Sequence, residues 1–322
     1  MNRREIFSPA AKQRAARFMA ERGTAVRRPN GGNGHGRTLV LDPAKLARFE
    51  PARERVAGQL TDGTLPARRR PVERREILQV SDLTIHFGGV HALEGVDLVA
   101  RTAEIAGVIG PNGAGKTTFF NCLSGLLTPD RGNIVFDGHK LDGSPASRGR
   151  VGLGRTFQTP RLFGSLSVLQ NLSFGCRTAD FSRREYVFDP ALRRLSHQER
   201  GARIARMVGY RGDLAAPAGS LPFGDLRTVE LARALCGAPS LLMLDEPASG
   251  LDVGQAEDFV ELLRNLSDLG LSILLIEHDM SLVMGICDHI TVLDFGQVIA
   301  EGPPSEIQRN EAVIEAYLGR SD

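Results

Sequence analysis

From residue 77 onward, the chain alternates short apolar runs with polar turns, a pattern that is typical of β-strands. The first two runs cover residues 77–80 and 83–85, and a polar turn separates them. A third run, residues 105–109, leads into a Gly-rich loop and then into an apolar-periodic segment over residues 117–127. The pattern predicts an ordered domain from about residue 77, with a strand, a loop and a helix in direct succession.

The middle of the chain, from about residue 162 to residue 235, changes to a helical period with charged faces. Residues 190–208 within it are rich in Arg, Leu and Ala, and we interpret the whole stretch as a helical insertion. Three short apolar runs follow, at residues 241–244, 272–276 and 290–293, and amphipathic segments alternate with them. This alternation predicts an α/β fold in which helices flank a parallel sheet.

The length of 322 residues and the hydrophobic content of 42% are ample for a buried core. The apolar runs are far shorter than the roughly 18–20 residues that span a bilayer. No apolar segment follows the basic residues of the N-terminus, and the cysteines have no disulfide or metal-ligand spacing. We therefore expect a protein of the reducing cytosol. The four cysteines are Cys122, Cys176, Cys236 and Cys287.

The net charge of +2 conceals two segments of opposite sign. Residues 1–75 contain 18 Lys and Arg against 7 Asp and Glu, a net charge of +11, so the remainder carries −9. The basic segment also holds a Gly-rich tract and buries too little apolar surface to offset its ordering entropy. We predict a disordered basic extension over residues 1–75; the alternative is an arm that contacts anionic lipid or a partner.

The Gly-rich loop has the sequence Gly110-Pro111-Asn112-Gly113-Ala114-Gly115-Lys116-Thr117, which fits the phosphate-binding pattern G-x-x-x-x-G-K-[ST]. Small residues there let backbone N–H groups surround phosphates at a helix N-terminus. An isolated match can arise by chance, but this one follows a predicted strand and opens a predicted helix. We predict nucleotide binding, with Lys116 on the β- and γ-phosphates and Thr117 on Mg²⁺.

Acidic and imidazole side chains follow two later apolar runs. Asp245 and Glu246 end the run at 241–244, where Asp245 suits Mg²⁺ and Glu246 suits the attacking water. His278 lies just past the run at 272–276, where its imidazole would contact the γ-phosphate and the water. Carboxylates often merely end a strand, and a lone His is usually structural. The phosphate-binding loop in the same domain favours the functional interpretation of all three.

A further segment, Leu221-Pro222-Phe223-Gly224-Asp225, is followed by Arg227 and by Glu230-Leu231-Ala232-Arg233. With this segment between the helical insertion and the second carboxylate run, residues 77–319 resemble the ABC ATPases. The resemblance implies a P-loop NTPase fold with a RecA-like parallel-sheet core, an antiparallel β subdomain and a helical subdomain over about 160–236. The nucleotide-binding domain would then cover residues 76–322.

The resemblance also implies roles for individual positions. Phe87 matches the aromatic residue against adenine, although an ordinary core role is nearly as common for such a Phe. Gln158 matches the glutamine that contacts Mg²⁺ and water and faces the transmembrane partner. The signature residues Pro222, Gly224 and Asp225 would cap the nucleotide of an opposite subunit, so two protomers would enclose two ATP molecules. The implied contacts to a protomer's own ATP comprise Phe87, Gly110, Pro111, Asn112, Gly113, Ala114, Gly115, Lys116, Thr117 and Thr118.

Two stretches narrow the resemblance to ATP-binding subunits of branched-chain amino acid importers. They are residues 154–163, which contain Gln158, and the C-terminal region from about residue 284 to 319. The implied partners are ATP, transmembrane permease subunits, a second ATPase chain and, indirectly, a periplasmic or surface substrate-binding protein, with no nucleic acid. The implied location is the cytoplasmic face of the cell membrane, and Ser249-Gly250-Leu251-Asp252 resembles the segment that communicates across the dimer.

The signature segment departs from the family pattern at Pro222 and Asp225, and Leu226, directly after it, replaces a polar residue that is common in relatives. Pro222 replaces the usual Ser and removes a hydroxyl and a backbone N–H, and Asp225 replaces the usual Gln and adds negative charge near a triphosphate. These changes motivate one alternative, a regulatory module that closes on ATP but scarcely hydrolyses it. The others are an exporter ATPase for lipid-linked substrates and a soluble ABC ATPase acting on ribosomes or DNA. The sequence identifies neither the solute nor whether the two ATPase chains are identical.

Overall fold

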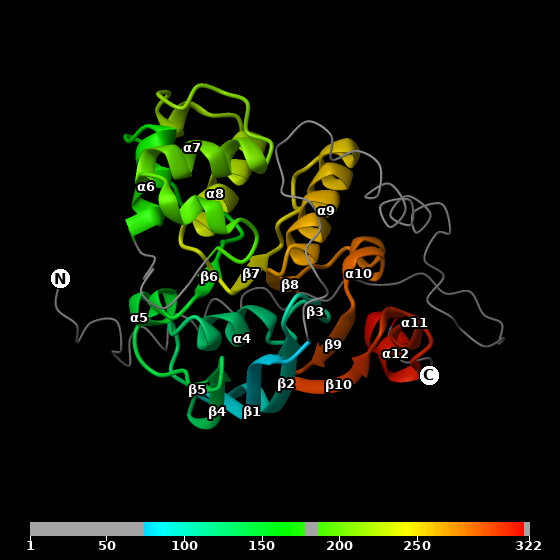
Figure 1. Cartoon of the computed structure of the whole chain (residues 1–322). Helices are drawn as coiled ribbons and strands as arrows, with labels where there is room; N and C mark the ends of the chain where they lie inside the picture. Colours follow the sequence, from blue (N-terminus) through cyan, green and yellow to red (C-terminus); the bar gives the residue numbers. More distant parts are fainter. Residues whose placement is uncertain (1–73, 178–185, 319–322) are drawn as a thin grey trace.

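The computed structural model describes residues 74–177 and 186–318 (Figure 1). The basic extension predicted over residues 1–75 therefore lies outside the described residues, apart from Arg74 and Arg75. The described chain forms two β-sheets with helices around them (Figure 1).

The larger sheet has six strands in the order β10-β9-β3-β8-β7-β6. All neighbours are parallel except β10, which pairs antiparallel with β9 at one edge. Every residue of β3, β7 and β8 is buried, which explains why these strands appear in the sequence as uninterrupted apolar runs. The predicted parallel sheet is confirmed. Its strands are β3 (Ile105–Ile109), β6 (Leu153–Arg155), β7 (Leu241–Asp245), β8 (Ser272–Ile276), β9 (His289–Asp294) and β10 (Gln297–Gly302).

The smaller sheet is antiparallel, with strand order β2-β1-β4-β5. The two strands predicted at 77–80 and 83–85 are wrong as separate elements, because β1 runs without a turn from Glu76 to Phe87. The polar residues between them form a register shift, at which Asp82 has a φ of 54°. The other strands are β2 (Val90–Arg101), β4 (Arg131–Phe136) and β5 (His139–Lys140).

Helices α6, α7 and α8 form a group at the end of the molecule opposite the antiparallel sheet (Figure 1). They fall within the stretch in which we predict helices. A capping box starts α7, because Ser196 and Glu199 each bond the backbone N–H of the other. Residues 190–208 contain a 3₁₀ turn, Pro190–Arg194, followed by α7. The three helices are α6 (Val168–Arg177), α7 (His197–Met207) and α8 (Phe223–Cys236).

Two apolar cores lie on opposite faces of the larger sheet. Strand β7 divides its side chains between them: Leu242 and Leu244 pack with the core that includes α6–α8, whereas Leu241 and Met243 pack with the antiparallel sheet. The alternation of side chains along a strand produces this division. The remaining helices are α4 (Lys116–Leu123), α5 (Pro145–Arg150), α9 (Val253–Asp268), α10 (Met280–Ile286), α11 (Pro304–Ile307) and α12 (Glu311–Leu318).

Within the described ranges, none of the helices combines the length and the apolar character needed to cross a membrane.

Helix α4 ends at Leu123, four residues before the predicted end at residue 127, and a buried arginine caps it. The Nη1 atom of Arg148 donates to the carbonyls of Cys122 and Leu123, at 2.6 and 2.7 Å. Carbonyls in the last helical turn have no N–H donor inside the helix, so this guanidinium supplies a donor to both. The carbonyl of Cys122 also accepts from the backbone N–H of Gly125, at 3.2 Å.

Replacing Arg148 by Met is expected to destabilise the fold by about 2 kcal/mol, because hydrogen bonds to charged groups contribute about 1.5–3 kcal/mol. Thermal unfolding would register this as a midpoint lower by about 4–8 °C. Arg150→Met on the same helix is the control, since Arg150 is exposed. Equal midpoints for the two variants would contradict the capping role of Arg148.

Candidate functional site

The phosphate-binding loop lies between β3 and α4, as predicted. Its backbone requires glycine at two positions in particular. A Cβ on Gly110, whose φ is 150°, would lie 2.0 Å from the carbonyl oxygen of Leu293. A Cβ on Gly115, whose φ is 101°, would lie 2.5 Å from the carbonyl oxygen of Ala92. The neighbouring strands therefore confine this loop from two sides.

Lys116 is buried at the start of α4, and its ammonium group folds back over the loop. The Nζ atom donates to the carbonyls of Gly110 and Pro111, at 2.6 and 2.9 Å. Burial lowers the pKa of Lys116, and the charges of Glu246 and Asp245 oppose that shift. Lys116 therefore interacts electrostatically with both carboxylates across the site. Of the other predicted loop residues, Asn112, Gly113 and Thr117 are exposed, Pro111 is half-buried, and Ala114 and Thr118 are buried.

Asp245 ends β7 and forms a buried ion pair with Arg155, which ends the neighbouring strand β6. The Nη2 atom of Arg155 lies 3.1 Å from Oδ2 of Asp245, and both side chains are 8% exposed. Burial raises the pKa of Asp245, while the guanidinium acts in the opposite direction. The Nη1 atom of Arg155 also donates to Asn121 Oδ1 and Ser124 Oγ, at 2.9 and 2.6 Å. Arg155 thus connects β6, β7 and the end of α4.

Glu246 follows β7 with a φ of 47°, in the left-handed region that side chains other than glycine rarely adopt. Its Oε2 atom accepts a hydrogen bond of 2.7 Å from Nε2 of Gln158. The structure therefore brings together Gln158 and Glu246, two residues 88 positions apart in the chain.

His278 lies on the same edge of the sheet, after β8. Its Nδ1 atom is 4.0 Å from Oε2 of Glu246 and 3.6 Å from Oε2 of Glu277, and its side chain is 61% exposed. Glu277 is 1% exposed and accepts a hydrogen bond of 2.9 Å from the backbone N–H of Ala248. Burial raises the pKa of Glu277. Glu277 thus fixes the segment after Glu246 relative to His278.

Arg227 connects helix α8 to both of these segments. Its Nη1 atom donates to the carbonyl of Glu246 at 3.1 Å, and its Nη2 atom donates to the carbonyl of Gln158 at 2.9 Å. The guanidinium also lies over the ring of Phe223, 5.1 Å from the ring centroid. A shift of α8 would therefore displace the backbone of Glu246 and that of Gln158 together.

The signature segment forms the N-terminus of α8. Pro222 is the N-cap residue and supplies no side-chain hydrogen bond, and Asp225 lies in the first turn. The ring of Phe223 packs against Gly250, where an added Cβ would approach the ring to 3.0 Å. Asp252, two residues further, caps α9 through a capping box with Gln255. The signature segment and residues 249–252 therefore contact each other within one chain.

Phe87 is only 6% exposed and belongs to the core of the antiparallel sheet. This is the packing expected of an ordinary core residue, which was the alternative to adenine contact. Adenine contact by Phe87 remains a prediction, as do the contacts of Pro222, Gly224 and Asp225 with a nucleotide.

A group of oxygen donors in the site suits a hard divalent cation. Thr117 contributes a hydroxyl at the exposed start of α4, Asp245 a carboxylate and Gln158 an amide oxygen. Oxygen ligands of these types are the ones that Mg²⁺ prefers. The amide nitrogen of Gln158 is occupied by Glu246, which leaves its oxygen as the atom for a cation.

Three residues that organise the site were missed by sequence reasoning: Arg155, Arg227 and Glu277. Arg155 and Arg227 lie inside the motifs that the sequence singles out, and Glu277 directly precedes His278. What the sequence offered was a charged residue next to a predicted strand or within a motif. It did not show which residue each would contact, because each partner lies far away in the sequence.

Comparison with known protein families gives two matches. Residues 93–249 match the family model described as ABC transporter. Residues 297–322 match the model described as branched-chain amino acid ATP-binding cassette transporter. The first match contains the phosphate-binding loop, Gln158, the signature segment and both carboxylates, whereas His278 lies beyond it.

Comparison with individual proteins gives long, nearly complete alignments. The chain is 42% identical over 253 residues to the high-affinity branched-chain amino acid transport ATP-binding protein BraF of Pseudomonas aeruginosa, covering 77% of this chain and 99% of BraF. It is 40% identical over 253 residues to the corresponding protein LivG of Escherichia coli K12, covering 76% of this chain and 98% of LivG. A crystal structure of an ATP-binding cassette of an ABC transporter, in its ADP conformation, has a TM-score of 0.66 and 30% identity; the match covers 76% of this chain and all of that one.

The close packing around Gly115 leads to a test on stability without nucleotide. Gly115→Ala is expected to destabilise the fold by about 1–3 kcal/mol more than Gly113→Ala, because overpacking costs that amount. Both glycines have a positive φ, but a Cβ at Gly113 meets no atom within 4 Å. Thermal unfolding of the two variants measures the difference. The confinement of the loop by Ala92 would be refuted by a Gly115→Ala variant as stable as Gly113→Ala.

Proposed function

The chain belongs to the family of ABC transporter ATP-binding proteins, and on this basis we propose that it powers an importer of branched-chain amino acids by binding and hydrolysing ATP. The P-loop NTPase fold predicted from the sequence agrees with this membership. The single observation that carries the catalytic proposal is the convergence of Lys116, Asp245, Glu246, Gln158 and His278 at the carboxyl edge of one parallel sheet.

ATP would bind with its phosphates in the loop from Gly110 to Thr117. Backbone N–H groups at the start of α4 face the phosphates, and Lys116 exchanges its two carbonyl contacts for phosphate oxygens. Thr118 extends the loop into the first turn of the helix. Phe87, or the hairpin that it anchors, would support the adenine.

Thr117, Asp245 and Gln158 would hold Mg²⁺. When bound, the ion neutralises charge on the phosphate oxygens. Arg155 acts by positioning, because its ion pair holds the carboxylate of Asp245 through Oδ2.

Hydrolysis requires a group that accepts a proton from the attacking water. We assign this role to Glu246, because its contacts with Gln158 and His278 both engage Oε2 and leave Oε1 for the water. His278 would contact the γ-phosphate through its exposed imidazole. Positioning and charge stabilisation supply most of the catalysis in such phosphoryl transfers.

The functional unit we propose is a dimer of ATPase chains. The N-terminus of α8 presents backbone N–H groups that have no partner inside the helix, and these would cap the ATP of the opposite chain. Gly224 allows close approach, whereas Asp225 opposes it by charge. The second ATPase chain of this dimer would be either an identical chain or a sister chain.

A groove of about 520 Å³ between the helical group and the sheet offers a place for the permease partner. Phe163 and Phe174 line it, and their side chains are 55% and 46% exposed. Their rings lie 5.7 Å apart, next to Arg233. Aromatic and Arg side chains are the ones enriched in protein interfaces. The backbone of the segment that contains Gln158 connects this groove to Glu246 through Arg227.

The proposed solute follows from the relatives. BraF and LivG carry branched-chain amino acid transport in their names, and the C-terminal segment matches the corresponding family model. The chain would work peripherally at the cytoplasmic face of the membrane, and a substrate-binding protein would deliver the amino acid to the permease.

Replacing Glu246 by Gln is expected to lower steady-state ATP turnover at least about 100-fold, because the amide cannot accept the proton. ATP binding and ATP-dependent dimerisation should persist. Cells that depend on this chain and its permease should likewise lose uptake of labelled leucine. The control is Glu257→Gln, an exposed position on α9, which should leave turnover and uptake unchanged.

Two outcomes would contradict the proposal. ATP binding without turnover in the wild-type chain, alone and with its permease, would favour an ATP-binding regulatory module. In the second, Glu246→Gln abolishes ATP turnover but leaves leucine uptake unchanged. The ATPase activity would then stand and the proposed solute would be wrong, and transport of a lipid-linked substrate would be the next assay.

Replacing Asp225 by Gln is expected to tighten ATP-dependent dimerisation by about 2- to 10-fold, because a neutral hydrogen bond contributes about 0.5–1.5 kcal/mol and the carboxylate repels phosphate. Light scattering measures ATP-dependent dimerisation of the Glu246→Gln variant and of the Glu246→Gln, Asp225→Gln double variant. Asp258→Asn, at an exposed position on α9, removes the same charge elsewhere. An equal effect of the two substitutions would exclude a local contact of Asp225 with nucleotide.

A further inference from the structure

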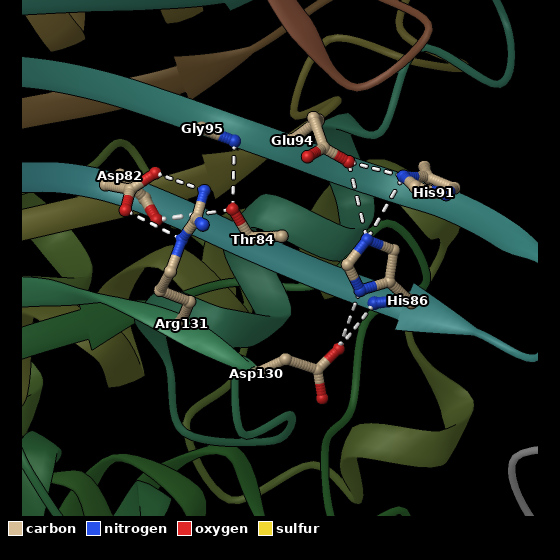
Figure 2. Close-up of polar contacts among 8 residues, drawn as sticks. All are labelled: Asp82, Thr84, His86, His91, Glu94, Gly95, Asp130 and Arg131. Atoms are coloured by element: carbon tan, nitrogen blue, oxygen red, sulfur yellow. Dashed lines mark hydrogen bonds and ion pairs between the residues drawn. The ribbon is translucent and has the colours of Figure 1, made fainter.

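Three potential metal ligands converge on the hairpin that β1 and β2 form in the antiparallel sheet (Figure 2). His86 lies near the end of β1, and His91 and Glu94 lie at the start of β2. His86 and His91 are direct cross-strand partners in the hairpin. One ligand atom from each of the three residues lies within 4.8 Å of the other two.

The separations between these atoms fit a small coordination polyhedron. The Nε2 atom of His86 is 3.1 Å from Nδ1 of His91 and 3.3 Å from Oε2 of Glu94. The third edge, between His91 Nδ1 and Glu94 Oε2, is the shortest of the three. Tetrahedral zinc sites with bonds of about 2.0–2.1 Å have ligand-to-ligand edges of about 3.3 Å. Two edges already match, and the third needs only a small opening at the exposed His91.

A fourth residue orients His86. The Nδ1 atom of His86 lies 3.2 Å from Oδ2 of Asp130, and the backbone N–H of His86 donates to the same oxygen at 2.8 Å (Figure 2). A carboxylate on Nδ1 favours the tautomer that carries its proton there, so the lone pair of Nε2 points toward His91 and Glu94. Metal-ligating histidines almost always have such a carboxylate or carbonyl partner on their second nitrogen.

Asp130 is itself held in place by its neighbours. Its backbone N–H donates to the carbonyl of Thr84 at 2.8 Å. The next residue, Arg131, binds both oxygens of Asp82, with Nε to Oδ2 at 2.7 Å and Nη2 to Oδ1 at 2.9 Å (Figure 2). The hydroxyl of Thr84 accepts a bond from the N–H of Gly95, on the facing strand. The supporting groups are thus fixed whether or not a cation is present.

The choice of cation follows from the donor set. Two imidazole nitrogens and one carboxylate oxygen suit Zn²⁺ and the related transition metals, whereas Mg²⁺ and Ca²⁺ prefer oxygen ligands alone. Both imidazoles can donate to Oε2 of Glu94, but their ring nitrogens then still face each other at 3.1 Å, whereas one metal ion binds all three atoms together.

We propose that His86 Nε2, His91 Nδ1 and Glu94 Oε2 bind one divalent transition-metal ion of the Zn²⁺ class, with Asp130 as the positioning residue for His86 and water in the remaining position. The ion would join the two strands of the hairpin next to Phe87. This inference does not rest on the proposed transport function, because it is read out by metal binding alone.

The test uses the full chain without an affinity tag and without nucleotide. Titration with Co²⁺ should give one equivalent of tightly bound ion with the visible absorption of a tetrahedral site, and Zn²⁺ should displace it. His91→Ala and Glu94→Gln should each weaken binding at least about 10-fold, and Asp130→Asn should weaken it by about 10- to 100-fold.

Two histidine variants serve as controls. His139→Ala removes an exposed imidazole from the same sheet, and His278→Ala removes the one beside Glu246 and Glu277; both should keep the Co²⁺ spectrum. The absence of a tetrahedral spectrum in the wild-type chain would overturn the proposal. Loss of the spectrum in His278→Ala, with its retention in His91→Ala and Glu94→Gln, would also overturn it and would assign the metal to the site beside Glu246 and Glu277.

Discussion

The buried ion pair between Arg155 and Asp245 is the interaction on which the geometry of the candidate site depends. One guanidinium joins the ends of two neighbouring strands to the end of α4, the helix that starts with Lys116. Removing one partner of a buried ion pair typically costs about 3–5 kcal/mol, because the other charge remains uncompensated. The strands and the helix are therefore fixed relative to each other before nucleotide binds, and the nucleotide meets an organised site.

Much of this site was predictable because strand ends are visible in a sequence. Lys116, Asp245, Glu246 and His278 each follow a short apolar run, and parallel strands bring their carboxyl ends to the same side of a sheet. The runs themselves were clear because β3, β7 and β8 are buried on both faces. The same reasoning gave the central sheet and the helical group.

The contacts that organise the site were not predictable, because each joins residues far apart in the sequence. Arg155 and Asp245 are separated by 90 positions, and Arg227 and Gln158 by 69. The antiparallel sheet was also only partly visible, since β1 contains a register shift that resembles a turn in the sequence. A polar pair within an apolar run is compatible with either structure, and the pairing of β1 with both β2 and β4 decides between them.

The left-handed backbone at Glu246 connects the site to the evolution of such chains. A non-glycine residue with this backbone conformation destabilises the fold by about 1–2 kcal/mol, and the cost is much smaller for Gly or Asn. Selection for stability alone would therefore favour replacing this glutamate, and the catalytic role that we propose for Glu246 would oppose the replacement. A descendant released from hydrolysis is expected to drift to Gly or Asn at this position and to become more heat-resistant. The residue at position 246 would then distinguish the descendants that hydrolyse ATP from those that do not.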